Sequence, residues 1–162
     1  MLKMSKRTLS LVLALIMICS AMSIMAFAAN GDVYWFEGSS SSFAFTTTDT
    51  SGATRSISCR VYYDGSWHDY DGTFFWNSLY CTLSNSANTN LEYSVSGATD
   101  SFTRYITISK VENNNRDTNL FKIRIILDKD DESVSVAYAP YISSGNLGTY
   151  IPISATCNVE LM

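Results

Sequence analysis

Residues 151–161, with the sequence IPISATCNVEL, alternate apolar and polar side chains almost without interruption. Successive side chains of a β-strand point to opposite faces, so this period of two predicts a strand with one buried face. Pro152 has no amide donor, which favours an edge strand, a bulge, or a strand that begins just after it. Similar alternation, noisier in places, recurs after residue 30 at 32–36, 42–48, 53–63, 74–84, 91–96, 102–111, 120–128 and 133–139.

Turn-forming residues separate these segments, for example Asp64-Gly65, Asp71-Gly72 and Ser144-Gly145. After residue 30, no window has apolar side chains at helical spacing over three turns. About nine short alternating strands predict an all-β domain, built as an antiparallel β-sandwich of the immunoglobulin-like or jelly-roll-like kind. A closed β-barrel is the alternative architecture.

The first 28 residues have the features of a signal peptide. A basic start (Lys3, Lys6 and Arg7) precedes an apolar stretch over residues 9–25, and Ala26-Phe27-Ala28 has the small residues that signal peptidase requires. An uncleaved anchor is the alternative, because roughly 20 apolar residues span a bilayer. We expect cleavage after Ala28, which would leave residues 29–162 as a single domain secreted into the extracellular medium.

The charge balance of the chain bears on its partners. The chain has 11 Lys and Arg against 15 Asp and Glu, and the three bases of the leader have no acidic counterpart there. An acidic mature chain repels phosphate backbones and anionic lipid. We therefore expect neither nucleic-acid binding nor membrane binding after cleavage of the leader, and the oligomeric state stays open.

Three cysteines follow the leader, at positions 59, 81 and 157. Outside the cytosol, two cysteines that lie close enough are expected to form a disulfide. If residues 53–63 and 74–84 form a hairpin centred near Tyr70, Cys59 and Cys81 are the candidate pair. A bridge between Cys59 and Cys157 is the alternative. The remaining cysteine is then a buried thiol or a handle for intermolecular pairing.

The sequence offers little for catalysis. His68 is the only histidine, and no serine lies in a G-x-S-x-G context. The cysteines fall on predicted core faces, which argues against a reactive thiolate. The acidic residues lie at turns or on polar strand faces, with no pair singled out by its surroundings. We predict a protein that is not an enzyme, and a secreted hydrolase is the disfavoured alternative.

The aromatic segment 62–72 is the candidate ligand-binding site. Aromatic rings in a predicted turn are costly to leave in water unless they pack on something. Flat rings beside carboxylates are typical of sugar-binding surfaces, and the same ring types are enriched in protein-binding hot spots. The structural alternative is that Trp67 folds back and caps the end of the sandwich. The candidate residues are Tyr62, Trp67, His68, Asp69, Tyr70 and Asp71.

Acidic residues cluster in a second predicted turn, at Asp128, Asp130, Asp131 and Glu132. Calcium needs several hard oxygens held by a loop, so this turn is the better of two candidate calcium sites. The other consists of Asp64, Asp69 and Asp71. Neither has the spacing of the twelve-residue calcium loop, and a solvated β-turn explains either one. No other cofactor is indicated.

These observations together predict a secreted, non-enzymatic binding module. Its partner is expected to be an extracellular protein or another component of a cell surface. The alternative is a carbohydrate-binding module that uses the aromatic turn around Trp67.

Overall fold

The computed structural model describes residues 31–98, 100–112, 115–143 and 145–162. The predicted leader and its cleavage site lie outside these residues. The described chain forms eleven strands: β1 (Val33–Ser40), β2 (Phe43–Thr48), β3 (Thr54–His68), β4 (Thr73–Ser84), β5 (Leu91–Gly97), β6 (Thr103–Glu112), β7 (Asn115–Asp128), β8 (Ser133–Ser143), β9 (Asn146–Leu147), β10 (Ile151–Ile153) and β11 (Ala155–Leu161). Within the described ranges, no helix is long and apolar enough to cross a membrane.

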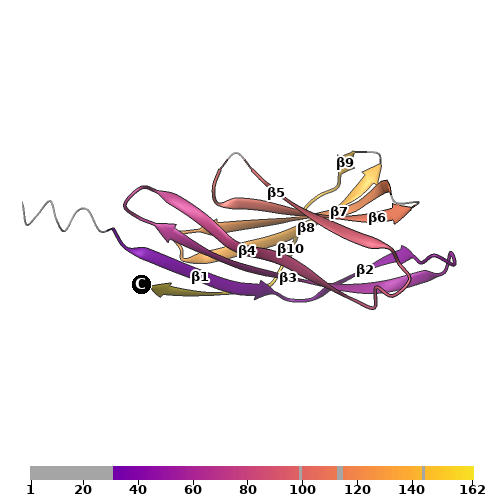
Figure 1. Ribbon diagram of the computed structural model, residues 1–162, viewed down its shortest axis with the longest axis horizontal. Coiled ribbons are helices and arrows are strands. Elements are labelled where there is room, and N and C mark those ends of the chain that lie inside the picture. The colour runs from indigo at the N-terminus through magenta and orange to yellow at the C-terminus, as the bar shows by residue number, and fades with distance from the viewer. Residues whose placement is uncertain (1–30, 99, 113–114, 144) are drawn as a thin grey trace, which may run out of the picture.

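The strands form two antiparallel sheets, which confirms the predicted all-β class. Sheet A has the order β11-β1-β3-β2, with β4 on the other edge of β3. The long strand β3 therefore pairs along one edge with β4 and along the other with β1 and then β2. Sheet B has the order β10-β8-β7-β6-β5, and β9 also pairs with β8. Figure 1 shows the indigo and magenta strands of sheet A lying against the orange strands of sheet B.

The C-terminal run that alternates so clearly is divided between the two sheets. β10 is the edge strand of sheet B beside β8, whereas β11 is the edge strand of sheet A beside β1. The break falls at Ser154, directly after the residues that pair with β8. Pro152 lies opposite Ala137 on the edge strand, where its missing amide donor costs little. The alternation predicted the buried face but not the change of sheet.

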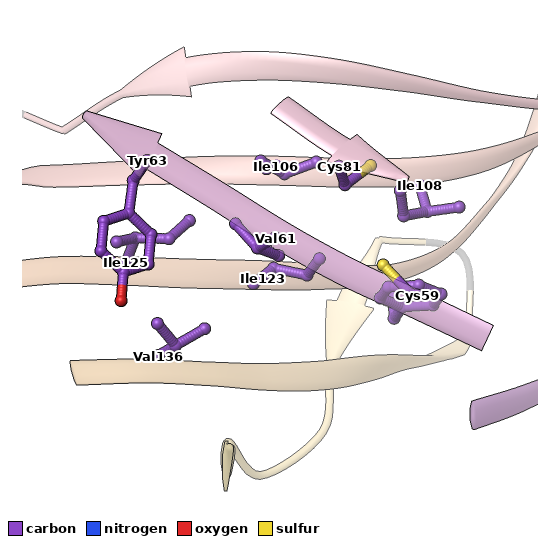
Figure 2. Packing of buried hydrophobic residues seen from close by; sticks show 10 residues of the cluster. Cys59, Val61, Tyr63, Cys81, Ile106, Ile108, Ile123, Ile125 and Val136 are labelled. Atoms are coloured by element: carbon purple, nitrogen blue, oxygen red, sulfur yellow. The ribbon is translucent and has the colours of Figure 1, made fainter. Parts of the chain in front are cut away.

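The main core lies between the two sheets (Figure 2). The inward side chains of β3 pack against isoleucines of β6 and β7, and these alternate with outward polar residues as the period of two requires. Ten buried residues form this cluster: Cys59, Val61, Tyr63, Cys81, Ile106, Ile108, Phe121, Ile123, Ile125 and Val136. A second cluster of buried residues, at the other end of the space between the sheets, contains Phe36, Trp67, Phe74 and Leu127.

One predicted turn is wrong, because Asp64-Gly65 lies inside β3, which continues to His68. Strands β1 and β4 pair with both edges of β3 here, so the local turn preference is overridden by tertiary pairing. A β-bulge accompanies the change of register between Asp64 and Gly65. A Cβ on Gly65 would overlap the Phe74 ring, which explains why glycine is needed in the strand. The turn at Asp71-Gly72 is present, so the hairpin centred near Tyr70 is confirmed.

A tyrosine crosses over a glycine where three strands of sheet A meet. Gly38 of β1 lies directly opposite Tyr63 of β3 and Cys157 of β11. The Tyr63 hydroxyl donates a hydrogen bond of 2.6 Å to the carbonyl oxygen of Thr156. The ring can reach this oxygen only because position 38 has no side chain. Burial raises the pKa of Tyr63 above its ordinary value, so the phenol stays a donor.

We therefore expect Gly38→Ala to destabilise the fold by about 1–3 kcal/mol through overpacking. The new Cβ would overlap the Thr156 carbonyl and lie 2.7 Å from the Tyr63 ring. Urea unfolding of the full-length protein measures the effect. Gly97→Ala is the matched control, because its Cβ would approach nothing nearer than the Arg104 side chain at 3.4 Å. Equal stability of the two variants would show that the packing of the Tyr63 ring does not require glycine at position 38.

Candidate functional site

The structure divides the aromatic segment 62–72 between the two faces of sheet A. Trp67 points inward and is only 6% exposed. Its ring lies 5.0 Å from the Phe102 ring and 5.2 Å from the Lys129 ammonium, and its Nε1 donates to Asp69 Oδ1 at 3.2 Å. The ring is therefore packed against protein, and its polar edge is hydrogen-bonded. Trp67 thus offers no free surface for stacking on a ligand.

The other candidates of this segment lie on the solvent side. Tyr62 and His68 alternate with the inward Val61, Tyr63 and Trp67, so both point away from the core. Tyr70, Asp69 and Asp71 are exposed in the turn between β3 and β4. Asp71 Oδ1 accepts the backbone amide of Thr73 at 3.0 Å, a bond that holds the turn.

Six aromatic side chains, named here the outer aromatic face, lie on the solvent side of sheet A or in its adjoining turn. Two groups can be distinguished within it. Tyr62 and Tyr80 stack in nearly parallel planes, with ring centroids 5.0 Å apart and an interplanar angle of 13°. Nearer the β3–β4 turn, His68 makes edge contacts with Tyr70 at 5.5 Å and with Phe75 at 4.8 Å. The six residues are Trp35, Tyr62, His68, Tyr70, Phe75 and Tyr80.

Strand register explains why Trp35 belongs to this face. Trp35 of β1 lies opposite Ser66 of β3, and Ser66 lies opposite Phe75 of β4. Directly opposed residues of antiparallel strands share a face, so the serine lies between two large rings. Ser66 is only 6% exposed although it is on the solvent side, which is the expected result of flanking by bulky neighbours.

A row of polar side chains separates the two aromatic groups. Glu37 of β1 lies opposite Asp64 of β3, which lies opposite Ser78 of β4. The Asn77 amide donates to Asp64 Oδ1 at 3.4 Å. Glu160 of β11 adds a third carboxylate opposite Trp35. The face therefore presents ring surfaces on both sides of a row of hydrogen-bonding groups.

Sequence reasoning missed three members of the outer aromatic face: Trp35, Phe75 and Tyr80. All three lie in strands, where packing in the core is the default for large aromatic side chains. For Trp35 and Phe75 the missed signal is that two aromatics are adjacent, at Trp35-Phe36 and Phe74-Phe75, as they also are at Tyr62-Tyr63. Neighbouring residues in a strand face opposite ways, so one ring of each pair must point to solvent. In each pair the structure buries one ring, at Phe36, Tyr63 and Phe74.

The surroundings of His68 resemble part of a nucleophile–base pair. Ser66 Oγ lies 3.1 Å from His68 Nε2, and the Tyr70 hydroxyl lies 3.3 Å from His68 Nδ1. In a hydrolytic triad the second ring nitrogen faces a carboxylate and the hydroxyl is open to substrate. Here the second nitrogen faces a phenol, and the serine is covered. These contacts orient the imidazole on the face rather than presenting a nucleophile.

The acidic residues proposed as a calcium site form the turn between β7 and β8. Asp128 Oδ1 accepts the backbone amides of Asp130 and Asp131, at 3.0 and 3.2 Å. Asp130 pairs with Lys129 at 2.7 Å, and Glu132 has a positive φ of 47°. Among the described residues, no three His, Cys, Asp or Glu side chains come together as a metal site. The contacts present are those of a β-turn.

The three described cysteines are free thiols, so the predicted disulfide is absent from this structure. Cys81 lies opposite Val61 and Cys59 lies opposite Leu83, which places the two cysteines diagonally across the hairpin. A hydrogen bond with Cys81, reinforced by burial, raises the pKa of Cys59. Burial raises the pKa of Cys157 to about 11.

A buried carboxylate that sequence reasoning did not single out organises the turn between β2 and β3. Asp49 Oδ1 accepts the hydroxyl and the amide of Ser51 and the amide of Ala53, and Oδ2 accepts Arg55 Nε. The Ser51 hydroxyl and the Arg55 guanidinium hold the pKa of Asp49 well below its ordinary range. These contacts lie within the turn and at the start of β3, so the Asp49 carboxylate stabilises the turn.

The outer aromatic face thus unites residues from β1, β3, β4 and the β3–β4 turn on one side of sheet A. It contains three of the six residues predicted from segment 62–72, namely Tyr62, His68 and Tyr70, and leaves Trp67 in the core. Comparisons with protein-family models, with curated proteins and with solved structures find no match to this chain.

Proposed function

We propose that this chain is a secreted, non-enzymatic binding module that contacts a cell-surface partner through the outer aromatic face of sheet A. The leader pattern of residues 1–28 supports action outside the cell. The acidic composition argues against nucleic acid and anionic lipid as partners. His68 faces the Tyr70 phenol instead of a carboxylate, and the neighbouring Ser66 is buried, which argues against a hydrolytic triad at this position.

The observation that carries this proposal is the exposure of large aromatic rings on the side of sheet A that faces away from the core, and in the β3–β4 turn beside it. Phe75, Tyr80 and Tyr70 are 47%, 43% and 57% exposed. The solvated face of an antiparallel sheet is normally polar, and the core of this domain is already filled from the other face. Exposed rings bordered by polar residues, as in the two groups of this face, are typical of interaction sites.

Retention of the protein on cell-surface material from its own host tests the proposal. We expect the Phe75→Ala/Tyr80→Ala variant of the full-length protein to be retained about tenfold more weakly or worse, because buried aromatic anchors dominate binding energy. The measurement is the fraction of labelled protein that sediments with washed cell envelopes.

Tyr105→Ala provides the control, since Tyr105 lies in sheet B, where its ring contacts Lys122 at 4.3 Å. This variant is expected to sediment like the unaltered protein. Absence of retention of the unaltered protein, or equal losses in both variants, would overturn the proposal.

A further inference from the structure

The side chains that lie between the rings of the outer aromatic face indicate the chemistry of its partner. The outward positions of the paired rows are occupied mainly by aromatic, hydroxyl and carboxylate groups. Examples are Ser39 beside Tyr62, and Glu37 beside Asp64. Protein–protein interfaces are depleted in Ser, Asp and Glu relative to the rest of a protein surface. The composition of this face therefore disfavours a protein partner, despite its rings.

A polysaccharide matches the same arrangement. Sugar rings have apolar C–H faces that can lie against flat aromatic rings, and they carry hydroxyl donors around their edges. Ionised carboxylates are acceptors only, so Glu37 and Asp64 are suited to receive those hydroxyl protons. The Asn77 amide beside Asp64 adds a donor for a hydroxyl or ring oxygen. Each component of the face thus has a counterpart on a glycan.

The two aromatic groups are spaced for an extended ligand rather than for a single sugar. Tyr62 and Ser66 lie four residues apart on β3, which corresponds to roughly 13 Å along a strand. Ser66 is in register with Trp35 and Phe75, so its position along β3 is also the position of these two rings. A ligand that contacts both groups must bridge the carboxylate row between them, as a chain of several sugar units can.

Charge narrows the class of polysaccharide. Three carboxylates lie on this side of sheet A, at Glu37, Asp64 and Glu160, whereas Arg60 lies at its far end, 5.2 Å from the Tyr62 ring centroid. The chain as a whole has a formal net charge of −4. Like charges across an interface are strongly unfavourable, so we expect this face not to bind an anionic polysaccharide.

We propose that the ligand of the outer aromatic face is an uncharged polysaccharide chain that lies flat across sheet A and contacts both aromatic groups. This inference rests on the proposed function, because it names the class of partner that the face binds. It places the exposed Tyr80 ring in one contact site, where the stacked Tyr62 ring supports it from behind, and Trp35 and Phe75 in the other.

Sedimentation with insoluble cellulose, chitin and mannan tests the inference, with polygalacturonate as the anionic comparison. We expect the full-length protein to be retained on at least one neutral polysaccharide and not on polygalacturonate. The Tyr62→Ala/Tyr80→Ala variant should bind about tenfold more weakly or worse, which corresponds to about 1.4 kcal/mol or more. Tyr105→Ala should bind like the unaltered protein, and urea unfolding confirms that both variants are folded. Equal retention on polygalacturonate, or unchanged binding by the double tyrosine variant, would overturn the inference.

Treatment of the host's cell envelopes separates failure of this inference from failure of the proposed function. Digestion with a mixture of glycoside hydrolases removes polysaccharide, so envelopes treated in this way should no longer retain the protein, whereas protease-treated envelopes should retain it. The opposite pattern would identify a protein partner, which overturns the polysaccharide while the binding function stands. No retention on untreated envelopes would overturn both.

Discussion

Replacing Ile123 with alanine is expected to lower the free energy of unfolding by about 2–5 kcal/mol, the cost of a cavity in a well-packed core. Ile123 lies on β7 with no exposed surface, among the inward side chains of both sheets (Figure 2). Neighbouring strands on both sides prevent the site from collapsing around the missing atoms. Urea unfolding of the full-length protein, followed by tryptophan fluorescence, measures the loss.

Ile126→Ala on the same strand is the matched control. Ile126 breaks the alternation of β7 and lies opposite Thr103 and Ser135, on the side of sheet B away from the core. Its side chain is half-buried, so its removal should cost about 1 kcal/mol or less. Equal effects of the two substitutions would mean that the faces of β7 are assigned wrongly.

The contrast between these two isoleucines shows what alternation alone can predict. In the alternating segment 120–128, Ile123 is in phase with Phe121, Ile125 and Leu127 and is predicted to point inward, whereas Ile126 is out of phase. The same alternation also places Cys59, Val61 and Tyr63 on a single face, which the structure confirms. Strand ends were less predictable. Asp64-Gly65 has strong turn propensity, yet pairing with β1 and β4 extends β3 through it.

The candidate site was predicted less well, for a related reason. An interpretation of residues 62–72 as a turn ignores their alternation and groups Trp67 with Tyr62 and His68. Tyr62 and Trp67 are five positions apart, and an odd separation puts residues of one strand on opposite faces. Register between strands was also needed, because Trp35 and Phe75 meet only through Ser66. A single sequence contains no direct signal for that register.

Trp67→Ala is expected to reduce stability by about 3–5 kcal/mol, as truncation of a buried aromatic does. Its ring fills the cluster with Phe36, Phe74 and Leu127 and contacts Phe102. His68→Ala changes the adjacent residue on the opposite face, where surface substitutions usually alter stability by about 0.5 kcal/mol or less. Thermal and urea unfolding of the two variants measure this difference between neighbouring positions.

Binding by a folded Trp67 variant then distinguishes a core residue from a ligand contact. Trp67→Phe retains an aromatic ring in the cluster and is expected to stay folded. Because the ring lies beneath the sheet, its replacement should leave retention on cell envelopes unchanged, whereas Phe75→Ala/Tyr80→Ala should reduce it. If Trp67→Phe lost retention while Phe75→Ala/Tyr80→Ala kept it, the ligand would have to bind at the end of the sandwich. The outer face of sheet A would then have no part in recognition.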